Sequence, residues 1–408
     1  MKEASFLEKL LDGERVEWKP LGEVLVRTKG TQITAGKMRQ LHKDGAPLKI
    51  FAGGRTVAFV NFDDIPAKDV NREPSIIVKS RGVIEFEYYD KPFSHKNEMW
   101  SYHSNNSQIH IKYVYHFLKL NEPYFQGIGS KMQMPQIATP DTDKFKIPIP
   151  CPENPKRSLE IQAEIVRILD NFTELTAELT AELTARKKQY AYYRDQLLTF
   201  AEGEVEWKRL GELGELVRGN GLPKTDFTEV GIPAIHYGQI YTYYGLSTTL
   251  TKSFVSPETA EKLKKVNKGD VVITNTSENL EDVGKALVYF GDQQAVTGGH
   301  ATIFKPNGLI LGKYLVYFTQ TVEFSNEKRK YSKGTKVIDV SATDMAKIKI
   351  PIPPLSVQEH IVNILDKFDA LTNSITEGLP REIELRKQQY EYYLDLLLNF
   401  PKNEGVTK

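Results

Sequence analysis

The residues of this chain that could perform catalysis do not occur in a catalytic pattern. Asp63 and Asp64, in the stretch NFDDIP, could hold a metal ion as paired carboxylates, but Asp-Asp-Ile-Pro is more typical of a turn. Five of the eight histidines lie between residues 42 and 116, and their spacing is not that of metal ligands. The stretch GLILGKY at Gly308–Tyr314 lacks the spacing and the hydroxyl group of a nucleotide-binding P-loop. We therefore expect no catalytic site in this chain.

Side chains suited to binding phosphates and base edges are frequent between residues 213 and 347. The stretch KRKYSKGTK at Lys328–Lys336 holds five Lys and Arg in nine residues, and a solvated turn is the alternative interpretation. Tyrosine, amide, hydroxyl and imidazole groups near glycines or after expected strands could contact bases. The candidates in this region are Tyr237, Gln239, Tyr241, Asn275, Thr276, His300, Lys330, Lys333, Thr335 and Lys336.

A second group of candidates lies between residues 24 and 145. It consists of Lys37, Arg39, Arg55, His95, Lys96, Asn97, Lys131, Gln133 and Gln136. The stretch KIPIP occurs at Lys146–Pro150 and again at Lys349–Pro353, and aligning the two copies places Lys131–Gln133 opposite Gly334–Lys336. We therefore expect equivalent loops of the two regions to carry equivalent contacts.

Charge and composition agree with a cytoplasmic protein that binds a polyanion. Lys and Arg outnumber Asp and Glu by 17 to 12 in residues 24–145 and by 16 to 14 in residues 213–347, whereas the whole chain has a net charge of only +1. These excesses are small, so ordinary solvated surfaces are equally compatible with them. The single cysteine, Cys151, excludes an internal disulfide and fits a reducing compartment. No stretch approaches the roughly 18 apolar residues of a membrane helix, so we expect no contact with a membrane.

The chain repeats itself. Three stretches recur in the same order, whereas residues 24–144 and 213–347 between them share no obvious similarity. The pairs are VEWKPLGE at Val16–Glu23 with VEWKRLGE at Val205–Glu212, IQAEIVRILDNF at Ile161–Phe172 with VQEHIVNILDKF at Val357–Phe368, and RKKQYAYYRDQLLTF at Arg186–Phe200 with RKQQYEYYLDLLLNF at Arg386–Phe400. Because Phe6–Trp18 resembles Arg194–Trp207, the chain begins in the middle of the repeating unit. The pattern predicts one frame in two copies about a pseudo-twofold axis, with the chain ends adjacent and two different inserts.

The repeated segments read as two long helices that pair through an apolar seam. Apolar residues recur at alternating spacings of three and four, which is typical of a coiled coil. The expected seam residues are Ile165, Ile168, Phe172, Leu175, Leu179, Leu183, Ile361, Ile364 and Phe368. A continuous helix over Ser158–Phe200 would be about 65 Å long. In the second copy Gly378-Leu379-Pro380 predicts a break. The tyrosines of this helical pattern are expected in a core or a protein interface rather than stacked on bases.

The inserts read as mixed α/β with many short strands, such as VGKALVYF, DVVITNT, HATIFKP and GVIEFEYY. The expected fold class is therefore α+β, with two globular mixed α/β domains joined by two long antiparallel helices. Residues 1–23, 146–212 and 348–408 form the frame, and residues 24–145 and 213–347 form the two inserts.

This combination of motifs resembles the specificity subunits of type I restriction-modification enzymes, and within them the family IC branch with TAEL repeats. The resemblance rests on the repeated VEWxxLGE, KIPIP and QxxIVxILDxF stretches and on TELTAELTAELTA at Thr173–Ala185, and it covers the frame but not the inserts. It implies that each insert is a target recognition domain that reads half of a split sequence in double-stranded DNA. It also implies two modification subunits on the frame helices and two ATP-driven restriction subunits. S-adenosylmethionine, ATP and magnesium are expected on those partners and not on this chain.

The TAEL repeat has a physical interpretation within that resemblance. Four helical residues advance about 6 Å and turn about 40° beyond a full turn, and one base pair turns the duplex by about 34–36°. One TAEL unit would therefore rotate one recognition domain by nearly one base-pair step. A slippage repeat in a tolerant exposed helix is the alternative.

Two other functions are compatible with parts of the pattern. A coiled-coil adaptor would use its two modules to bind proteins or other ligands. An enzyme that acts on DNA by itself is disfavoured because the corresponding motifs are missing from the sequence.

Overall fold

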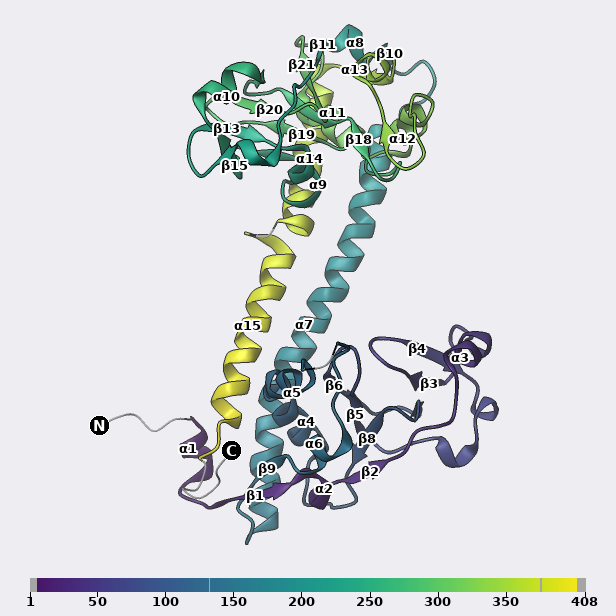
Figure 1. Cartoon of the computed structure of the whole chain (residues 1–408), viewed down its shortest axis with the longest axis vertical. Helices are drawn as coiled ribbons and strands as arrows, with labels where there is room; N and C mark the ends of the chain where they lie inside the picture. Colours follow the sequence, from purple (N-terminus) through teal and green to yellow (C-terminus); the bar gives the residue numbers. More distant parts are fainter. Residues whose placement is uncertain (1–5, 132, 375, 402–408) are drawn as a thin grey trace, which may run out of the picture. The chain divides into compact units, whose positions relative to one another are not determined.

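The computed structural model describes residues 6–131, 133–374 and 376–401. The chain divides into two compact units, of which unit 1 comprises Met1–Glu178 with Ile383–Lys408 and unit 2 comprises Leu179–Glu382 (Figure 1). Unit 1 contains the insert of residues 24–145, called insert 1, and unit 2 contains the insert of residues 213–347, called insert 2. In the part of the chain that is described, no helix is long and apolar enough to span a membrane.

Each unit contains a two-stranded antiparallel ribbon built from the repeated frame sequences. In unit 1, β1 (Val16–Pro20) pairs with β9 (Lys146–Pro150), and Trp18 lies opposite Pro148. In unit 2, β10 (Glu206–Arg209) pairs with β23 (Lys349–Ile352), and Trp207 lies opposite Pro351. The short helices α2 (Leu21–Val24) and α8 (Leu210–Leu213) follow the first strand of each ribbon. The ribbon therefore closes the base of each insert by joining its two ends.

The main sheets of the two inserts have the same strand order. In insert 1 the order is β2-β8-β5-β6, and in insert 2 it is β11-β21-β17-β19-β14, with antiparallel pairing between the corresponding neighbours. The strands of insert 1 are β2 (Val26–Thr28), β5 (Ser75–Lys79), β6 (Glu85–Tyr89) and β8 (Trp100–His103). Those of insert 2 are β11 (Gly214–Arg218), β14 (Ser247–Thr248), β17 (Val271–Thr274), β19 (Ala286–Tyr289) and β21 (Ala301–Pro306).

A second sheet also has a common centre in the two inserts. In insert 1 the order is β4-β3-β7, with β3 (Leu48–Phe51) parallel to β7 (Phe93–His95) and antiparallel to β4 (Val57–Val60). In insert 2, β13 (Ile232–Ile235) is likewise parallel to β20 (Ala295–Thr297) and antiparallel to β15 (Ser253–Val255). The edges of this sheet in insert 2 are β12 (Phe227–Thr228) and β16 (Lys264–Val266), and a separate pair is formed by β18 (Thr276–Ser277) and β22 (Ile338–Asp339). Two sequences without obvious similarity thus adopt one fold.

Helices cover these sheets, and two of them also pack on the frame helices. In insert 1 they are α3 (Ala35–Leu41), α4 (Ile111–Leu120), α5 (Glu122–Gly129) and α6 (Thr139–Asp143). In insert 2 they are α9 (Tyr237–Thr242), α10 (Pro257–Lys262), α11 (Gly312–Phe318), α12 (Val322–Arg329) and α13 (Ala342–Met345). Helices α4 and α11, which pack on the frame helices, occupy corresponding places in the two inserts, because along the chain each lies between the last strand of its main sheet and the second ribbon strand. Both are strongly buried, with Tyr113 and Tyr314 inaccessible to solvent.

The frame helices confirm the expected long helix and the expected break. Helix α7 (Pro155–Leu198) runs for 44 residues, and Thr173–Ala185 lies inside it. Its partner is divided into α14 (Leu355–Asn373) and α15 (Gly378–Leu398). Gly378 has a φ of +75°, a conformation that favours glycine, and a side chain there would collide with the Ala370 carbonyl oxygen at 2.5 Å. The break therefore has a local backbone cause.

The frame helices run antiparallel within each unit (Figure 1). Aromatic pairs join them in both units. In unit 1 the ring of Phe172 on α7 stacks on Tyr393 of α15 with 5.0 Å between centroids. In unit 2 the ring of Tyr193 on α7 stacks on Phe368 of α14 at 5.6 Å. Ile165 and Ile361 are buried, and Ile168 and Ile364 are half-buried. These contacts place the repeated tyrosines in a helix interface, as the spacing predicts.

The leucines of the TAEL repeat are less buried than Ile165 and Ile361 of the seam. Leu175 is 36% exposed, and Leu179 and Leu183 are only half-buried. The reason is geometric, because residues four apart on an α-helix drift by about 40° per step and cannot all face one partner. The repeat therefore lies in the most weakly packed part of α7.

The first and last described segments of the chain meet in unit 1, as the circular arrangement predicts. Leu7 and Leu11 of helix α1 (Phe6–Leu11) belong to the same buried cluster as Leu397 and Phe400. The indole nitrogen of Trp18 donates to the carbonyl oxygen of Pro401 at 3.3 Å. The first and last described segments of the chain thus complete one core.

Candidate nucleic-acid interface

In insert 2, several predicted residues come together where β17 and β21 meet. The imidazole of His300 lies 4.7 Å from the ring of Tyr237, and its Nδ1 is 3.1 Å from the hydroxyl oxygen of Thr276. The hydroxyl group of Tyr241 donates to the Thr276 carbonyl oxygen at 2.8 Å. Asp339 pairs with Thr276 across β18 and β22 and with Lys333 through a second bridge. These residues form one rim of the insert.

One further cation reaches this rim, and the sequence did not reveal it. The guanidinium of Arg218, at the end of β11, donates to the Gly299 carbonyl oxygen at 3.2 Å and lies 3.6 Å from the carboxylate of Asp339. Its side chain is 48% exposed. We define rim 2 as Arg218, Tyr237, Thr276, His300, Lys333 and Asp339. Arg218 stands alone in its stretch of sequence, so only the pairing of β11 with β21 brings it to the rim.

In insert 1, a corresponding rim forms around Arg81, which the sequence also did not single out. The backbone of Arg81 pairs with Gln136, and the backbone nitrogen of Gly54, next to Arg55, donates to the Arg81 carbonyl oxygen at 3.0 Å. The loop that contains Lys131 ends at this bridge, and Lys96 follows β7. We define rim 1 as Arg55, Arg81, Lys96, Lys131 and Gln136. The side chains of Arg55, Arg81, Lys131 and Gln136 are exposed.

The two rims have equivalent backbones. The backbone nitrogen of Ile137 donates to the Ser80 carbonyl at 3.0 Å in insert 1, and that of Val340 donates to the Asn275 carbonyl at 2.9 Å in insert 2. These donors are 203 residues apart, which is the offset between the KIPIP copies. This backbone pairing agrees with an equivalence of the two loops that precede it, which contain Lys131–Gln133 and Gly334–Lys336.

The basic stretch Lys328–Lys336 is less free than its sequence suggests. Lys328 is buried and donates to the carbonyl oxygens of Glu281 at 2.8 Å and Val283 at 2.6 Å, and burial lowers its pKa to about 8. Lys330 pairs with Glu327, and Lys333 lies 2.8 Å from the carboxylate of Asp344. Thr335 and Lys336 are exposed. Of the predicted phosphate contacts, Lys333 belongs to rim 2, and Lys336 lies close to it in the chain.

Two candidates are buried and are withdrawn from the proposed contact set. His95 is inaccessible, its Nε2 lies 3.2 Å from the Ser101 hydroxyl, and burial lowers its pKa to about 4. Asn275 is also inaccessible, and its side-chain oxygen accepts a hydrogen bond from Thr302 at 2.7 Å. Both prediction errors arise because these polar residues end buried strands, where their side chains point into the insert.

The remaining candidates lie apart from the bridges that define the rims. Lys37 and Arg39 are exposed on α3, which packs on β4. Gln239 is half-buried, and its amide donates to the Ser253 hydroxyl at 2.6 Å. Asn97 and Gln133 are exposed in loops next to rim 1.

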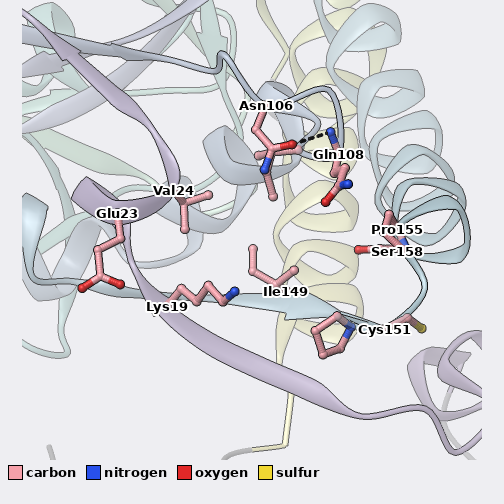
Figure 2. A pocket seen from close by; sticks show the side chains of 11 residues that line it. Lys19, Glu23, Val24, Asn106, Gln108, Ile149, Cys151, Pro155 and Ser158 are labelled. Carbon is pink, nitrogen blue, oxygen red and sulfur yellow. Dashed lines mark hydrogen bonds between the residues drawn. The ribbon is translucent and has the colours of Figure 1, made fainter.

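A small cavity in unit 1 has no arrangement suited to catalysis. Its volume is about 150 Å³, and its lining includes Lys19, Glu23, Gln108, Cys151 and Ser158. Figure 2 shows these side chains beside the ribbon of β1 and β9. Burial raises the pKa of the Cys151 thiol, so the thiol stays protonated and is a poor nucleophile. In the described residues, no three side chains of the metal-ligating types come together.

The chain consists of two copies of one frame, and each copy carries a domain of the same fold. This architecture is that of a scaffold with two binding domains. A family model described as the type I restriction modification DNA specificity domain matches residues 16–186 and 202–385. The specificity subunit of the EcoR124I/EcoR124II type I restriction enzyme of Escherichia coli is 40% identical over 423 residues, which cover 100% of both chains. The EcoprrI specificity subunit of Escherichia coli is 30% identical and covers 92% of this chain and 93% of its own length.

The fold agrees with these sequence relationships. The crystal structure of a type I restriction-modification S subunit from M. genitalium matches 96% of this chain and 98% of its own, with a TM-score of 0.59 and 16% identity. This likeness concerns the fold alone. The chain belongs to the family of type I restriction-modification specificity subunits. It is a DNA sequence-specificity subunit and not a catalytic one.

Proposed function

We propose that each insert reads one half of a bipartite target in double-stranded DNA and that α7 with its partner helices sets the spacer between the halves. One observation carries the proposal, namely that equivalent backbone positions of the two rims bear different side chains. The backbone bridge of rim 1 joins Arg81 to Gln136, and the equivalent backbone bridge of rim 2 joins Thr276 to Asp339. Because donor and acceptor patterns decide which base edge is bound, two such rims would read different sequences.

The charges of each rim support contact with a duplex. Arg81 and Arg218 are exposed guanidinium groups placed near amide, hydroxyl and aromatic side chains, which suits bidentate contacts to guanine or to phosphate. Lys131 and Lys336 lie in equivalent loops and would contact phosphates, which position a protein without specifying sequence. Salt-dependent binding is therefore expected.

Mapping of methylated bases across the genome tests the proposal. Cells that express this chain together with its modification subunit should carry methylation within two short sequences separated by an unread spacer of constant length. A single uninterrupted motif would contradict the proposal. Methylation without any motif would favour the adaptor alternative for the two inserts.

Replacing Arg218 with Ala should weaken recognition of one half-site only. Loss of a specific arginine contact costs about 1–3 kcal/mol of binding free energy and relaxes selection at the contacted base. Arg81→Ala should have the same effect on the other half-site. The measurement is the methylation rate on duplexes that carry single-base changes in each half.

Arg218→Lys is the matched control for this prediction. It keeps the positive charge but loses the planar fork that binds a base edge or a carboxylate in a bidentate manner. If the contact reads a base, Arg218→Lys should still relax selection. Equal weakening of both half-sites by Arg218→Ala would show that Arg218 does not act within one recognition domain.

The frame helices would bind two modification subunits. Tyr192 and Tyr392 occupy equivalent positions of the repeated QYxYY stretch and are 61% and 63% exposed. Each packs edge-on against the next tyrosine, with 5.5 Å and 5.4 Å between centroids. Exposed tyrosines held by a neighbouring ring are suited to protein interfaces. One such position in each copy of the frame supports one modification subunit per copy.

Restriction subunits would join the complex through the modification subunits. S-adenosylmethionine, ATP and magnesium would be bound by these partners, as the family resemblance implies. The described residues of this chain would then contribute only DNA contacts and assembly.

A further inference from the structure

Insert 1 is fastened to helix α7 by a buried amide. The side-chain oxygen of Gln162 accepts a hydrogen bond from the backbone nitrogen of His110 at 2.9 Å. The side-chain nitrogen of Gln162 donates to the carbonyl oxygen of Gln108 at 3.1 Å. Gln162 is inaccessible to solvent, so these bonds form without competition from water. The side-chain amide of Gln162 therefore binds one backbone N–H and one backbone carbonyl group in the segment just before helix α4.

An ion pair lies two helical turns further along α7. The carboxylate of Asp170 lies 2.7 Å from the amine of Lys112 and 3.0 Å from Nε2 of His116, both on α4. Nδ1 of His116 is 3.0 Å from the hydroxyl oxygen of Tyr390 on α15. Burial opposes ionisation of Asp170, but hydrogen bonds from His116 and Lys112 outweigh it and hold the pKa of Asp170 below its usual value. Asp170 thus joins insert 1 to the frame as a charged acceptor.

The same contacts recur in unit 2 between different sequences. The side-chain oxygen of Gln358 on α14 accepts from the backbone nitrogen of Leu311 at 2.9 Å, and its nitrogen donates to the Leu309 carbonyl at 3.0 Å. Eight residues later, Asp366 lies 2.9 Å from the amine of Lys313 and accepts a hydrogen bond from the hydroxyl group of Tyr317. The residue that takes the place of His116 is therefore a tyrosine with the same function.

A third contact completes each junction. The hydroxyl group of Tyr113 donates to the Pro148 carbonyl oxygen at 2.8 Å, and that of Tyr314 donates to the Pro351 carbonyl oxygen at 3.0 Å. Both inserts therefore present Lys-Tyr followed three residues later by His or Tyr, and both frame helices present Gln and Asp eight residues apart. Insert sequences that otherwise differ throughout agree at the residues that face the frame.

These polar contacts can fix an angle that apolar packing leaves free. The burial of Ile165 and Leu169 stabilises the junction of α7 without regard to direction. Hydrogen bonds require alignment of donor and acceptor, so they resist rotation of the insert about its helix. A rotation of about 34–36° corresponds to one base-pair step of the duplex. A small angular error would therefore change which spacer length lets both rims meet their half-sites.

We propose that Asp170 and Asp366, with Gln162 and Gln358, are positioning residues that set the angle of each insert on its frame helix and thereby restrict the subunit to one spacer length. This inference rests on the proposed function, because it assumes two half-sites read at a set separation. It concerns the accuracy of the spacer and not the sequence of either half-site.

The test uses the chain assembled with its modification subunit and a set of duplexes. Each duplex carries both half-sites, with the native spacer or with a spacer longer or shorter by one base pair. Asp170→Asn keeps the shape of the side chain and removes its charge. We expect the methylation rate of duplexes with an altered spacer to rise about tenfold relative to that of the duplex with the native spacer. This change corresponds to about 1.4 kcal/mol of lost discrimination between spacer lengths. Selection of bases within both half-sites should stay unchanged.

Two further variants separate positioning from folding. Lys112→Met removes one donor and leaves Asp170 bonded to His116, so it should fold and should give a smaller rise in the same ratio. Asp366→Asn makes the equivalent change in unit 2 and should also relax the spacer. Glu164→Gln is the matched control, because Glu164 forms an exposed ion pair with Arg167 on the same helix, at 2.7 Å, without contacting an insert in the described contacts.

The results distinguish failure of this inference from failure of the proposed function. Asp170→Asn and Lys112→Met could instead lower the methylation of all duplexes by the same factor, whatever their spacer length. These residues would then stabilise the protein without setting the spacer, and the inference would be wrong. If the wild-type complex methylates duplexes that carry one half-site alone, the proposed bipartite function is wrong.

Discussion

Deleting Thr176–Leu179 should shorten the spacer of the target by one base pair and leave both half-sites unchanged. Removal of four helical residues takes away about 6 Å and about 40° beyond a whole turn. The rotation nearly matches the 34–36° of one base pair, whereas the translation exceeds the 3.4 Å rise of the duplex. A tilt of the inserts or a distortion of the DNA must absorb the remaining length. The expected effect is a complete change of target, because duplexes with the former spacer should no longer be methylated.

The structure suggests that the helix tolerates this deletion. The removed segment lies in the weakly packed middle of α7, where Leu175 is 36% exposed. The partner of α7 is already divided between α14 and α15, so its two parts can shift without bending a continuous helix. Four residues make little more than one helical turn. Their removal therefore keeps the apolar positions of α7 close to their original face, as a stutter does in a coiled coil.

Methylation mapping of the deletion variant measures the spacer directly. Insertion of one additional TAEL unit should lengthen the spacer by one base pair and serves as the opposite change. Glu178→Gln, which keeps the length of the helix, should leave the spacer as it is. An unaltered spacer in the deletion variant would show that the repeat is a tolerated slippage product.

Replacing Tyr392 with Asp should remove one of two modification subunits from the complex, and Tyr192→Asp should remove the other. A charge placed in the centre of a protein interface must be desolvated without a partner, and loss of a central tyrosine alone costs 2 kcal/mol or more. That cost corresponds to about thirtyfold weaker binding. The double variant should bind neither subunit and should have no methylation activity.

Native mass spectrometry of the mixed subunits measures this effect as a change in stoichiometry. Tyr392→Phe is the matched control, because it keeps the ring and should retain two modification subunits. Substitution of Tyr193, which stacks on Phe368, would instead disturb the helix pair itself. If both Asp variants assemble with two modification subunits, the exposed tyrosines are not the contact surface.

The frame could be derived almost entirely from the sequence. Nearly identical stretches at Val16–Glu23 and Val205–Glu212 indicated the duplication, and the ribbons β1–β9 and β10–β23 confirm it. The apolar spacing predicted α7, and Gly378 predicted the interruption before α15. These features depend on residues close in the chain, because helical periodicity and glycine conformation are local properties.

The inserts could not be compared by sequence. Strand segments such as Val271–Thr274 could be recognised from their β-branched residues, but nothing indicated that both inserts share one strand order. A sheet requires only that buried positions be apolar and of suitable volume, so many sequences satisfy the same topology. The common fold therefore became apparent only from the pairing of strands that lie far apart in the chain.

The candidate contact residues were predicted in part. Tyr237, Thr276, His300 and Lys333 do come together, whereas His95 and Asn275 are buried. Residue type indicates which contacts a side chain can make, but burial depends on which face of a strand it occupies and on what packs against it. Arg81 and Arg218 were missed because each is an isolated charge until a strand pairing brings it to a rim.

By itself the sequence determined the duplicated frame, the long helix with its repeat and the family of specificity subunits. Only the tertiary structure decided which polar groups reach a rim and which, like Asp170 and Asp366, fasten an insert to the frame. The physical reason is that helical periodicity depends on neighbouring residues and a repeat is found by comparing stretches of sequence. A hydrogen bond or a buried side chain instead depends on partners supplied from distant segments. Lys112 and Asp170 are 58 residues apart in the sequence and 2.7 Å apart between amine nitrogen and carboxylate oxygen.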